Sequence, residues 1–423
     1  MSNMYQKTTL DNGLRVITST MEHTRSVSIG FFIGAGSRYE KGEEAGISHF
    51  IEHLCFKGTQ RRATGREVSE VIEGVGGILN GGTDKELTVY WCKISQLHFL
   101  SALDVLMDML CHSRFDHQDI EKERQIISEE IDMVLDLPPH RVGLLIDEVL
   151  WPNQPLGRDV AGTKATVSGI TSQGMLNYLA HQYIPSNIVV SVAGGVTHDE
   201  VLHELKEDFD CRQKGTSQAW YPAQDEQHAP QFCIETRDTE QAHLCLALRG
   251  LSLSHPDRFV IDLLSVILGE GMSSRLFTEV REKLGLAYAI SSTTDHLLDT
   301  GSLSIYAGVN PKNLTTAIRA ILEELHKLKE EIPEDELSKA KELSKGRLLL
   351  RMEDTRSVIS WQGIQELLLG NILSVDEVIS MIDSIQADDL LRVAQKLLVS
   401  EGLNLAVVGP ADDKQHLEEL LHL

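Results

Sequence analysis

Three residues whose types and spacing suit metal chemistry lie in one short stretch of the sequence. His49, Glu52 and His53 form the pattern H-x-x-E-H within residues 46–56, where apolar residues recur at three- and four-residue intervals. Such spacing predicts a helix, on which the two histidines project from one face and could bind the same Zn²⁺. Glu52 would lie close enough to act as general base on a zinc-activated water, which is the chemistry of metal-assisted hydrolysis.

A zinc ion held by two histidines needs a third protein ligand and leaves its fourth position for water. The sequence of residues 118–135 strongly favours a helix, which would carry Glu129 and Glu130 side by side. Adjacent positions on a helix point about 100° apart, so only one of the two could reach the metal. The residues by themselves leave this choice open.

The composition limits the class of partner. The chain has 423 residues and a net charge of −24, from 63 acidic and 39 basic residues, which argues against a nucleic-acid partner because phosphate would be repelled. The six cysteines show no C-x-x-C pattern, and no run of 18 apolar residues or apolar N-terminal signal is present. We therefore expect free thiols and a soluble, cytoplasmic protein without a membrane partner.

The chain reads as two copies of one domain. Residues 27–29 (Val-Ser-Ile) correspond to residues 244–246 (Leu-Cys-Leu), and the strand expected at 187–195 corresponds to the one beginning at Asn404, both at an offset of 217. Together with a polar linker over 211–231, this pattern predicts a tandem duplication with domains at 1–215 and 216–423. The fold class is α+β, with an antiparallel-rich sheet covered by helices in each domain. The counterpart of the histidine-bearing helix, at 259–268, contains no histidine, so only the first domain could be catalytic.

Residues 48–59, Ser-His-Phe-Ile-Glu-His-Leu-Cys-Phe-Lys-Gly-Thr, resemble the signature of the pitrilysin/insulinase family of zinc peptidases. The resemblance is closest to the branch that holds the mitochondrial processing peptidases and their short bacterial relatives, and it covers nearly the whole chain. Further matching segments are residues 12–16, 36–38, 79–80, 123–130, 162–163, 268–277 and 280–288.

The resemblance implies roles for two glutamates. The third zinc ligand of the family aligns with Glu130 rather than with Glu129, and one zinc ion per chain is expected. An acidic residue that supports the site aligns with Glu123, which lies two helical turns before Glu130 and shares its face. The other interpretation of Glu123 is a solvated charge on a helix surface.

The resemblance also implies contacts with substrate. Asn80 matches an asparagine near the bound peptide, although Gly81 and Gly82 follow it where relatives often carry alanine. Arg281 and Tyr288 match a pair that the second domain contributes, Arg281 to hold the peptide backbone and Tyr288 to donate a hydrogen bond to the oxyanion.

The function implied is that of a zinc-dependent endopeptidase that hydrolyses short or unfolded peptides in an enclosed, clam-shell chamber. Because the zinc motif and the Arg–Tyr pair occur in one chain, we expect a homodimer. Two alternatives are a non-catalytic structural or assembly subunit and a catalytic subunit that needs a separate partner chain. The first is disfavoured because His49, Glu52, His53 and Glu130 are all present.

Overall fold

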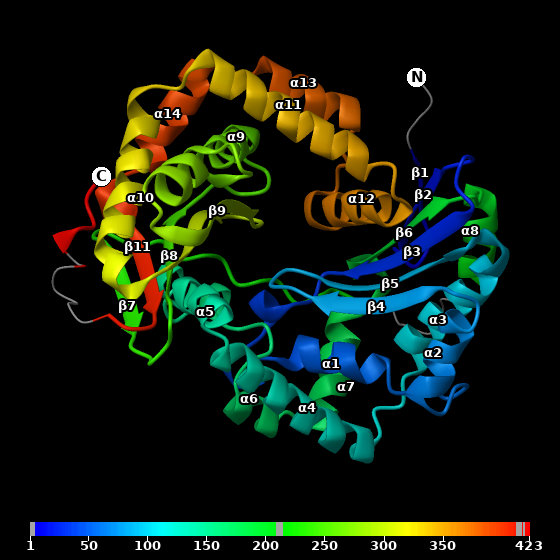
Figure 1. Cartoon of the computed structure of the whole chain (residues 1–423). Coiled ribbons are helices and arrows are strands. Elements are labelled where there is room, and N and C mark those ends of the chain that lie inside the picture. The colour runs from blue at the N-terminus through cyan, green and yellow to red at the C-terminus, as the bar shows by residue number, and fades with distance from the viewer. Residues whose placement is uncertain (1–4, 209–214, 412–416, 418) are drawn as a thin grey trace. The chain divides into compact units, whose positions relative to one another are not determined.

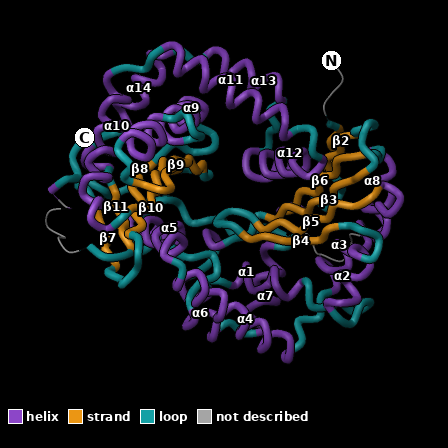
Figure 2. Tube along the Cα trace, in the orientation of Figure 1, coloured by secondary structure: helices purple, strands orange, loops and turns teal. Residues whose placement is uncertain are grey.

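The computed structural model describes residues 5–208, 215–411, 417 and 419–423. These residues form two β-sheets, each with helices on both faces (Figures 1 and 2). The chain divides into two compact units, which are described separately below.

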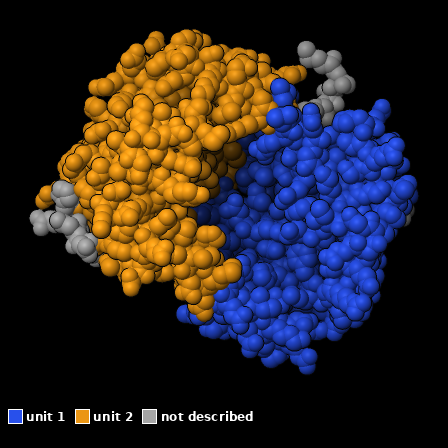
Figure 3. Space-filling view, in the orientation of Figure 1, with its two compact units in different colours: residues 1–131, 159–221, 349–374 blue, residues 132–158, 222–348, 375–423 orange. Residues whose placement is uncertain are grey.

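The two compact units are not consecutive halves of the chain. Unit 1 comprises residues 1–131, 159–221 and 349–374, and unit 2 comprises residues 132–158, 222–348 and 375–423 (Figure 3). Each unit therefore includes a segment from the other half of the sequence. The predicted boundary between homologous halves at residues 215 and 216 is a different division of the chain and stays a prediction.

Unit 1 is built on a six-stranded sheet in the order β1-β2-β6-β3-β5-β4. All neighbouring strands are antiparallel except β2 and β6, and β1 and β2 form a hairpin. Among the described strands, β4 pairs with β5 alone and so forms one edge of the sheet. The strands are β1 (Gln6–Thr9), β2 (Arg15–Thr20), β3 (Ser26–Ile33), β4 (Ile78–Thr83), β5 (Thr88–Ser95) and β6 (Ile188–Gly194).

Helices cover both faces of this sheet, as the full burial of β6 requires. Helix α12 lies against β3 and β6 on one face, whereas α1, α2 and α3 pack on the other (Figure 1). The helices that lie wholly in unit 1 are α1 (Ile47–Cys55), α2 (Gly65–Glu73), α3 (Phe99–His112), α6 (Lys164–Gly169), α7 (Ser172–Gln182), α8 (His198–Asp208) and α12 (Thr355–Leu369). Helix α4 (His117–Asp136) continues from unit 1 into unit 2.

Unit 2 contains a five-stranded sheet in the order β7-β11-β8-β10-β9, with β9 at one edge. Helix α5 packs on β8 and β11, and α9 packs on β9. The strands are β7 (Gln231–Glu235), β8 (Ala242–Arg249), β9 (Ala287–His296), β10 (Gly301–Val309) and β11 (Asn404–Val408). The helices that lie wholly in unit 2 are α5 (Pro138–Leu150), α9 (Arg258–Gly269), α10 (Leu314–Glu330), α13 (Val375–Ser384) and α14 (Ala387–Leu397). Helix α11 (Glu334–Arg351) begins in unit 2 and ends in unit 1.

The two sheets have the same topology once β1 is set aside, which agrees with a tandem duplication. Ile29 pairs with Val192 in unit 1, and Leu244 pairs with Val407 in unit 2. Leu244 follows Ile29 by 215 positions, and Val407 follows Val192 by the same number. The offset of 217 predicted from sequence is therefore wrong by two residues. A shift of two residues keeps every side chain on the same face of a strand, which explains why the sequence pattern did not reveal it.

The duplicated halves exchange equivalent helices. Helix α12, from the second half of the chain, covers the sheet of unit 1, whereas α5, its counterpart at the same offset, covers the sheet of unit 2. Buried hydrogen bonds fix α12 in place: Gln362 Nε2 donates to Ser19 Oγ at 2.6 Å, and the hydroxyls of Thr355 and Ser28 lie 2.8 Å apart. Since sequence periodicity shows only that a helix has an apolar face, it could not show which sheet that face covers.

The cysteine prediction is only partly correct. Cys92, Cys233 and Cys245 carry free thiols, but Cys111 is disulfide-bonded, and Cys211 lies outside the described residues. Among the described residues, no helix combines the length and hydrophobicity needed to cross a membrane.

Candidate metal centre

The helix that carries H-x-x-E-H is held at its N-terminus by a buried carboxylate. Helix α1 follows Gly46, whose φ of 95° favours glycine, and it has no side-chain cap from its own N-cap residue. Instead, Glu40 accepts hydrogen bonds from the backbone N–H groups of Gly46 and Ser48, both at 2.8 Å. A negative charge there also complements the helix dipole. Glu40 therefore fixes the turn from which His49 projects.

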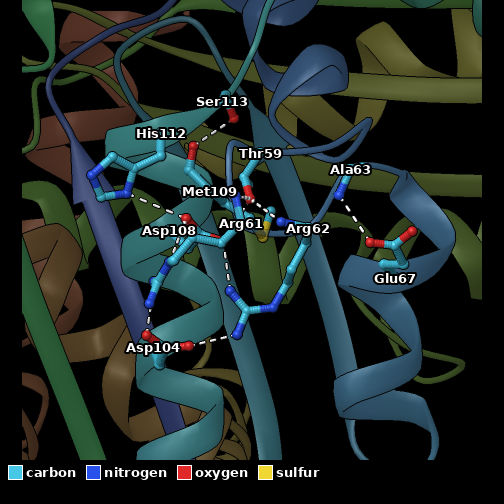
Figure 4. A network of polar contacts seen from close by, with 10 residues as sticks. All are labelled: Thr59, Arg61, Arg62, Ala63, Glu67, Asp104, Asp108, Met109, His112 and Ser113. Atoms are coloured by element: carbon cyan, nitrogen blue, oxygen red, sulfur yellow. Dashed lines mark hydrogen bonds and ion pairs between the residues drawn. The ribbon is translucent and has the colours of Figure 1, made fainter.

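The segment that leaves α1 is anchored to α3 through buried ionic contacts (Figure 4). Asp108 is fully buried and accepts hydrogen bonds from Thr59 Oγ1 at 2.6 Å, Arg61 Nε at 3.0 Å and Arg62 Nη1 at 2.5 Å. Burial alone would raise the pKa of Asp108, but these hydrogen bonds outweigh it and hold the pKa below its usual value. Both ends of α1 are thus fixed by acidic residues outside the helix.

His49, His53 and Glu130 bring three ligand atoms together. The Nε2 atoms of the histidines are 3.2 Å apart, and Glu130 Oε2 lies 3.8 Å from His49 Nε2 and 3.6 Å from His53 Nε2. Donors bound tetrahedrally to zinc at ordinary bond lengths are separated by about 3.4 Å. The three atoms therefore fit one zinc ion with only small adjustments, and no other such group of histidine, cysteine and carboxylate ligands occurs among the described residues.

The two histidines differ in how their surroundings affect their protonation. Glu123 Oε2 lies 3.2 Å from His53 Nδ1, so an Nδ1–H donated to this carboxylate leaves Nε2 with its lone pair toward the other ligands. Burial, assisted by the neighbouring His53, lowers the pKa of His49 to about 4. For His53, burial alone would lower the pKa, but the hydrogen bond to Glu123 and the nearby carboxylates raise it.

The three glutamates on α4 that the sequence singled out have different surroundings. Glu130 reaches the histidines, whereas its neighbour Glu129 is exposed and lines a surface groove beside Lys57. Glu123 is only 3% exposed and binds both His53 and Lys57 Nζ, the latter at 2.7 Å. The alternative of a solvated helix charge therefore does not fit Glu123.

Glu52 lies beside this group of ligands and is nearly buried. Its Oε2 accepts a hydrogen bond from Thr83 Oγ1 at 3.1 Å. Burial raises the pKa of Glu52 above its usual value, and the charge of Glu130 adds to this, although His53 and Thr83 oppose it. A carboxylate with a raised pKa is a stronger base, which suits proton abstraction from water.

The residues predicted to contact substrate are divided between the two units. Asn80 pairs with Trp91, which packs in the core cluster that includes Ile359 of α12, so Asn80 lies on the face of β4 turned away from α1. Arg281 and Tyr288 belong to unit 2, where the Arg281 guanidinium lies 5.4 Å from the centre of the Tyr288 ring. Tyr288 is 77% exposed.

Sequence reasoning missed three residues that shape this centre: Glu40, Lys57 and Thr83. Lys57 lies in the stretch matched to the family signature, and its spacing of four from His53 could have indicated a shared helical face. No periodic pattern marks Glu40 or Thr83, since Glu40 precedes α1 and Thr83 lies on a different element.

Family models match most of the chain. Residues 15–164 match the model described as Insulinase (Peptidase family M16), and residues 169–344 match the one described as Peptidase M16 inactive domain. This chain belongs to the M16 family of peptidases. The "inactive" description falls on the part of the chain whose counterpart of α1, helix α9, lacks histidine.

Similar proteins are found in bacteria. An uncharacterized zinc protease of Bacillus subtilis is 36% identical, over 96% of this chain and 99% of that protein. One from Streptomyces coelicolor is 35% identical, over 97% of this chain and 90% of that protein. These names support zinc as the metal and proteolysis as the class of reaction.

Solved structures share the fold. A protease from Helicobacter pylori matches with a TM-score of 0.90 at 24% identity, over 96% of this chain and 99% of that one. A chain of Complex III2 from Candida albicans matches with a TM-score of 0.85 at 20% identity, over 99% of this chain and 100% of that one. At these identities the likeness concerns the fold alone.

Proposed function

We propose that this protein is a zinc-dependent endopeptidase that binds one zinc ion per chain. The observation that carries the proposal is the near-tetrahedral spacing of the ligand atoms of His49, His53 and Glu130, with the carboxylate of Glu52 beside them. When bound there, zinc would polarise the scissile carbonyl and lower the pKa of a water molecule.

The residues of the chain would then carry the proton. Glu52 accepts a proton from the attacking water and returns it to the leaving nitrogen, so one carboxylate serves as base and then as acid. Its nearly buried position limits competition from bulk water. Glu123 holds His53 in the tautomer and orientation that metal binding needs.

Strand β4 is the proposed platform for the substrate. As an edge strand it leaves one row of backbone groups without a partner strand, and an extended peptide could add to it through main-chain hydrogen bonds. Such binding favours short or unfolded peptides over folded proteins. Asn80, at the surface of β4, is proposed to contact this peptide, as are Arg281 and Tyr288; association as a homodimer and a cytoplasmic location also remain predictions.

The test pairs metal analysis with peptide hydrolysis for the wild type and Glu52→Gln. We expect about one zinc per chain in both proteins, and cleavage of a quenched peptide only by the wild type, because glutamine cannot accept the proton. A variant that keeps its activity would refute the role of Glu52. A wild type that binds no zinc would favour a structural subunit, and one that binds zinc without cleaving any of a diverse set of peptides would indicate a missing partner chain.

A further inference from the structure

The position of Glu52 depends on the edge strand that faces it. Glu52 projects from α1 toward β4, and Thr83 is the hydrogen-bond partner of its Oε2 atom. An ionised carboxylate can only accept, so the hydroxyl of Thr83 must be the donor. This contact joins the general base assigned above to a strand that contributes no metal ligand.

The backbone of β4 is shaped to receive the carboxylate. Gly81 lies two residues before Thr83 and so faces the same side of the strand. A β-carbon at Gly81 would come within 2.9 Å of both Glu52 Oε1 and the ring of Phe56. The missing side chain thus leaves room for one carboxylate oxygen, while Thr83 holds the other. Gly82, on the opposite face, has open space around its position.

The Thr83 hydroxyl is itself well oriented. Thr83 pairs with Thr88 across β4 and β5, and Thr88 Oγ1 donates to the backbone oxygen of Ala35 at 2.9 Å. Thr88 Oγ1 also donates toward Thr83 Oγ1 at 3.4 Å, so the Thr83 oxygen accepts on that side and its own proton is directed to Glu52. Thr83 supplies a side-chain hydrogen bond to Glu52, whereas His53 and Glu130 act on it through their charges.

We propose that Thr83 is a positioning residue, which holds the Glu52 carboxylate in the orientation required for proton transfer. The proposal rests on the proposed function, in which Glu52 is the general base. A general base must lie within hydrogen-bond reach of the proton that it removes, and a misplacement of about 1 Å can cost roughly 100-fold in rate.

The kinetic test compares Thr83→Val, which keeps the shape but removes the donor, with Thr83→Ser, which keeps the donor. We expect kcat to fall by about tenfold or more in Thr83→Val, with KM and zinc content unchanged, and to be largely retained in Thr83→Ser. Thr9→Val is the matched control, because Thr9 is an exposed residue on β1, the opposite edge of the same sheet. A Thr83→Val enzyme with wild-type kcat, or equal losses in the valine and serine variants, would overturn the proposal.

A second measurement does not depend on activity. Unfolding midpoints of the metal-free wild type, Thr83→Val, Glu52→Gln and the double variant form a thermodynamic cycle. If Thr83 holds Glu52, the two substitutions together shift the midpoint differently from the sum of their separate shifts. Additive shifts would remove the structural basis of the proposal. An inactive wild type would bear on the proposed function alone, whereas the cycle would still report on the contact.

Discussion

Replacing Glu130 with glutamine should weaken zinc binding, whereas the same change at Glu129 should not. The two residues are adjacent on α4, and each substitution removes one negative charge near the site. Only Glu130 places an oxygen within 3.8 Å of both histidine Nε2 atoms, while Glu129 is exposed. Comparing the two variants therefore distinguishes the loss of a direct zinc ligand from the general effect of removing a negative charge.

The expected magnitude follows from the number of ligands. Removing a residue that only orients a zinc ligand typically costs 10- to 100-fold in affinity, so loss of one of three direct ligands should cost about 100-fold or more. This factor corresponds to about 2.7 kcal/mol. At saturating zinc for the wild type, the same free energy is lost from zinc-induced stabilisation, which lowers the zinc-dependent rise in Tm by roughly 5–10 °C for a unit of this size.

Two assays measure this difference. Competition with a chromophoric chelator gives the zinc dissociation constants of the wild type, Glu129→Gln and Glu130→Gln. Thermal unfolding with excess zinc and with excess chelator gives the zinc-dependent shift, and the chelator series controls for changes in the fold itself. Weakened binding in Glu129→Gln with normal binding in Glu130→Gln would refute the ligand assignment, and equal weakening in both would attribute the effect to charge alone.

Two further predictions concern the anchors of α1. Glu40→Ala should lower the free energy of unfolding by about 2–4 kcal/mol, because two backbone N–H groups at the start of the helix lose a charged acceptor. Glu40→Gln retains one acceptor oxygen and should lower it less. Urea denaturation measures both values, and equal losses would contradict the capping role. Asp108→Asn should cost about 3 kcal/mol or more near neutral pH, because it breaks a buried ion pair. As the pKa of Asp108 is lowered in the folded protein, its contribution is present above the unfolded pKa of about 4 and is lost as pH falls through the folded value. The difference between wild type and Asp108→Asn should therefore shrink below about pH 4, and a difference that grows there would contradict the ion pair.

Local patterns in the sequence located the parts of the site that lie on single elements. His49, Glu52 and His53 share one helix, so their spacing alone predicted their juxtaposition. The contacts of Glu52 with Thr83 and of α1 with Glu40 join different elements, and no periodicity reports them. The duplication was recognisable, but its register was misjudged by two residues because strands repeat every two.

The exchange of α5 and α12 has a consequence for biosynthesis. During translation, the six strands of the first sheet emerge long before α12, yet the ion pair between Lys7 and Glu366 spans 359 positions of sequence. Until the ribosome has passed residue 369, the nascent sheet exposes the apolar face that α12 will cover, including Phe32 and Val189. Contacts of such long range slow folding and expose the nascent chain to aggregation. A fragment truncated at the middle of the sequence lacks α12 and should therefore need chaperone protection.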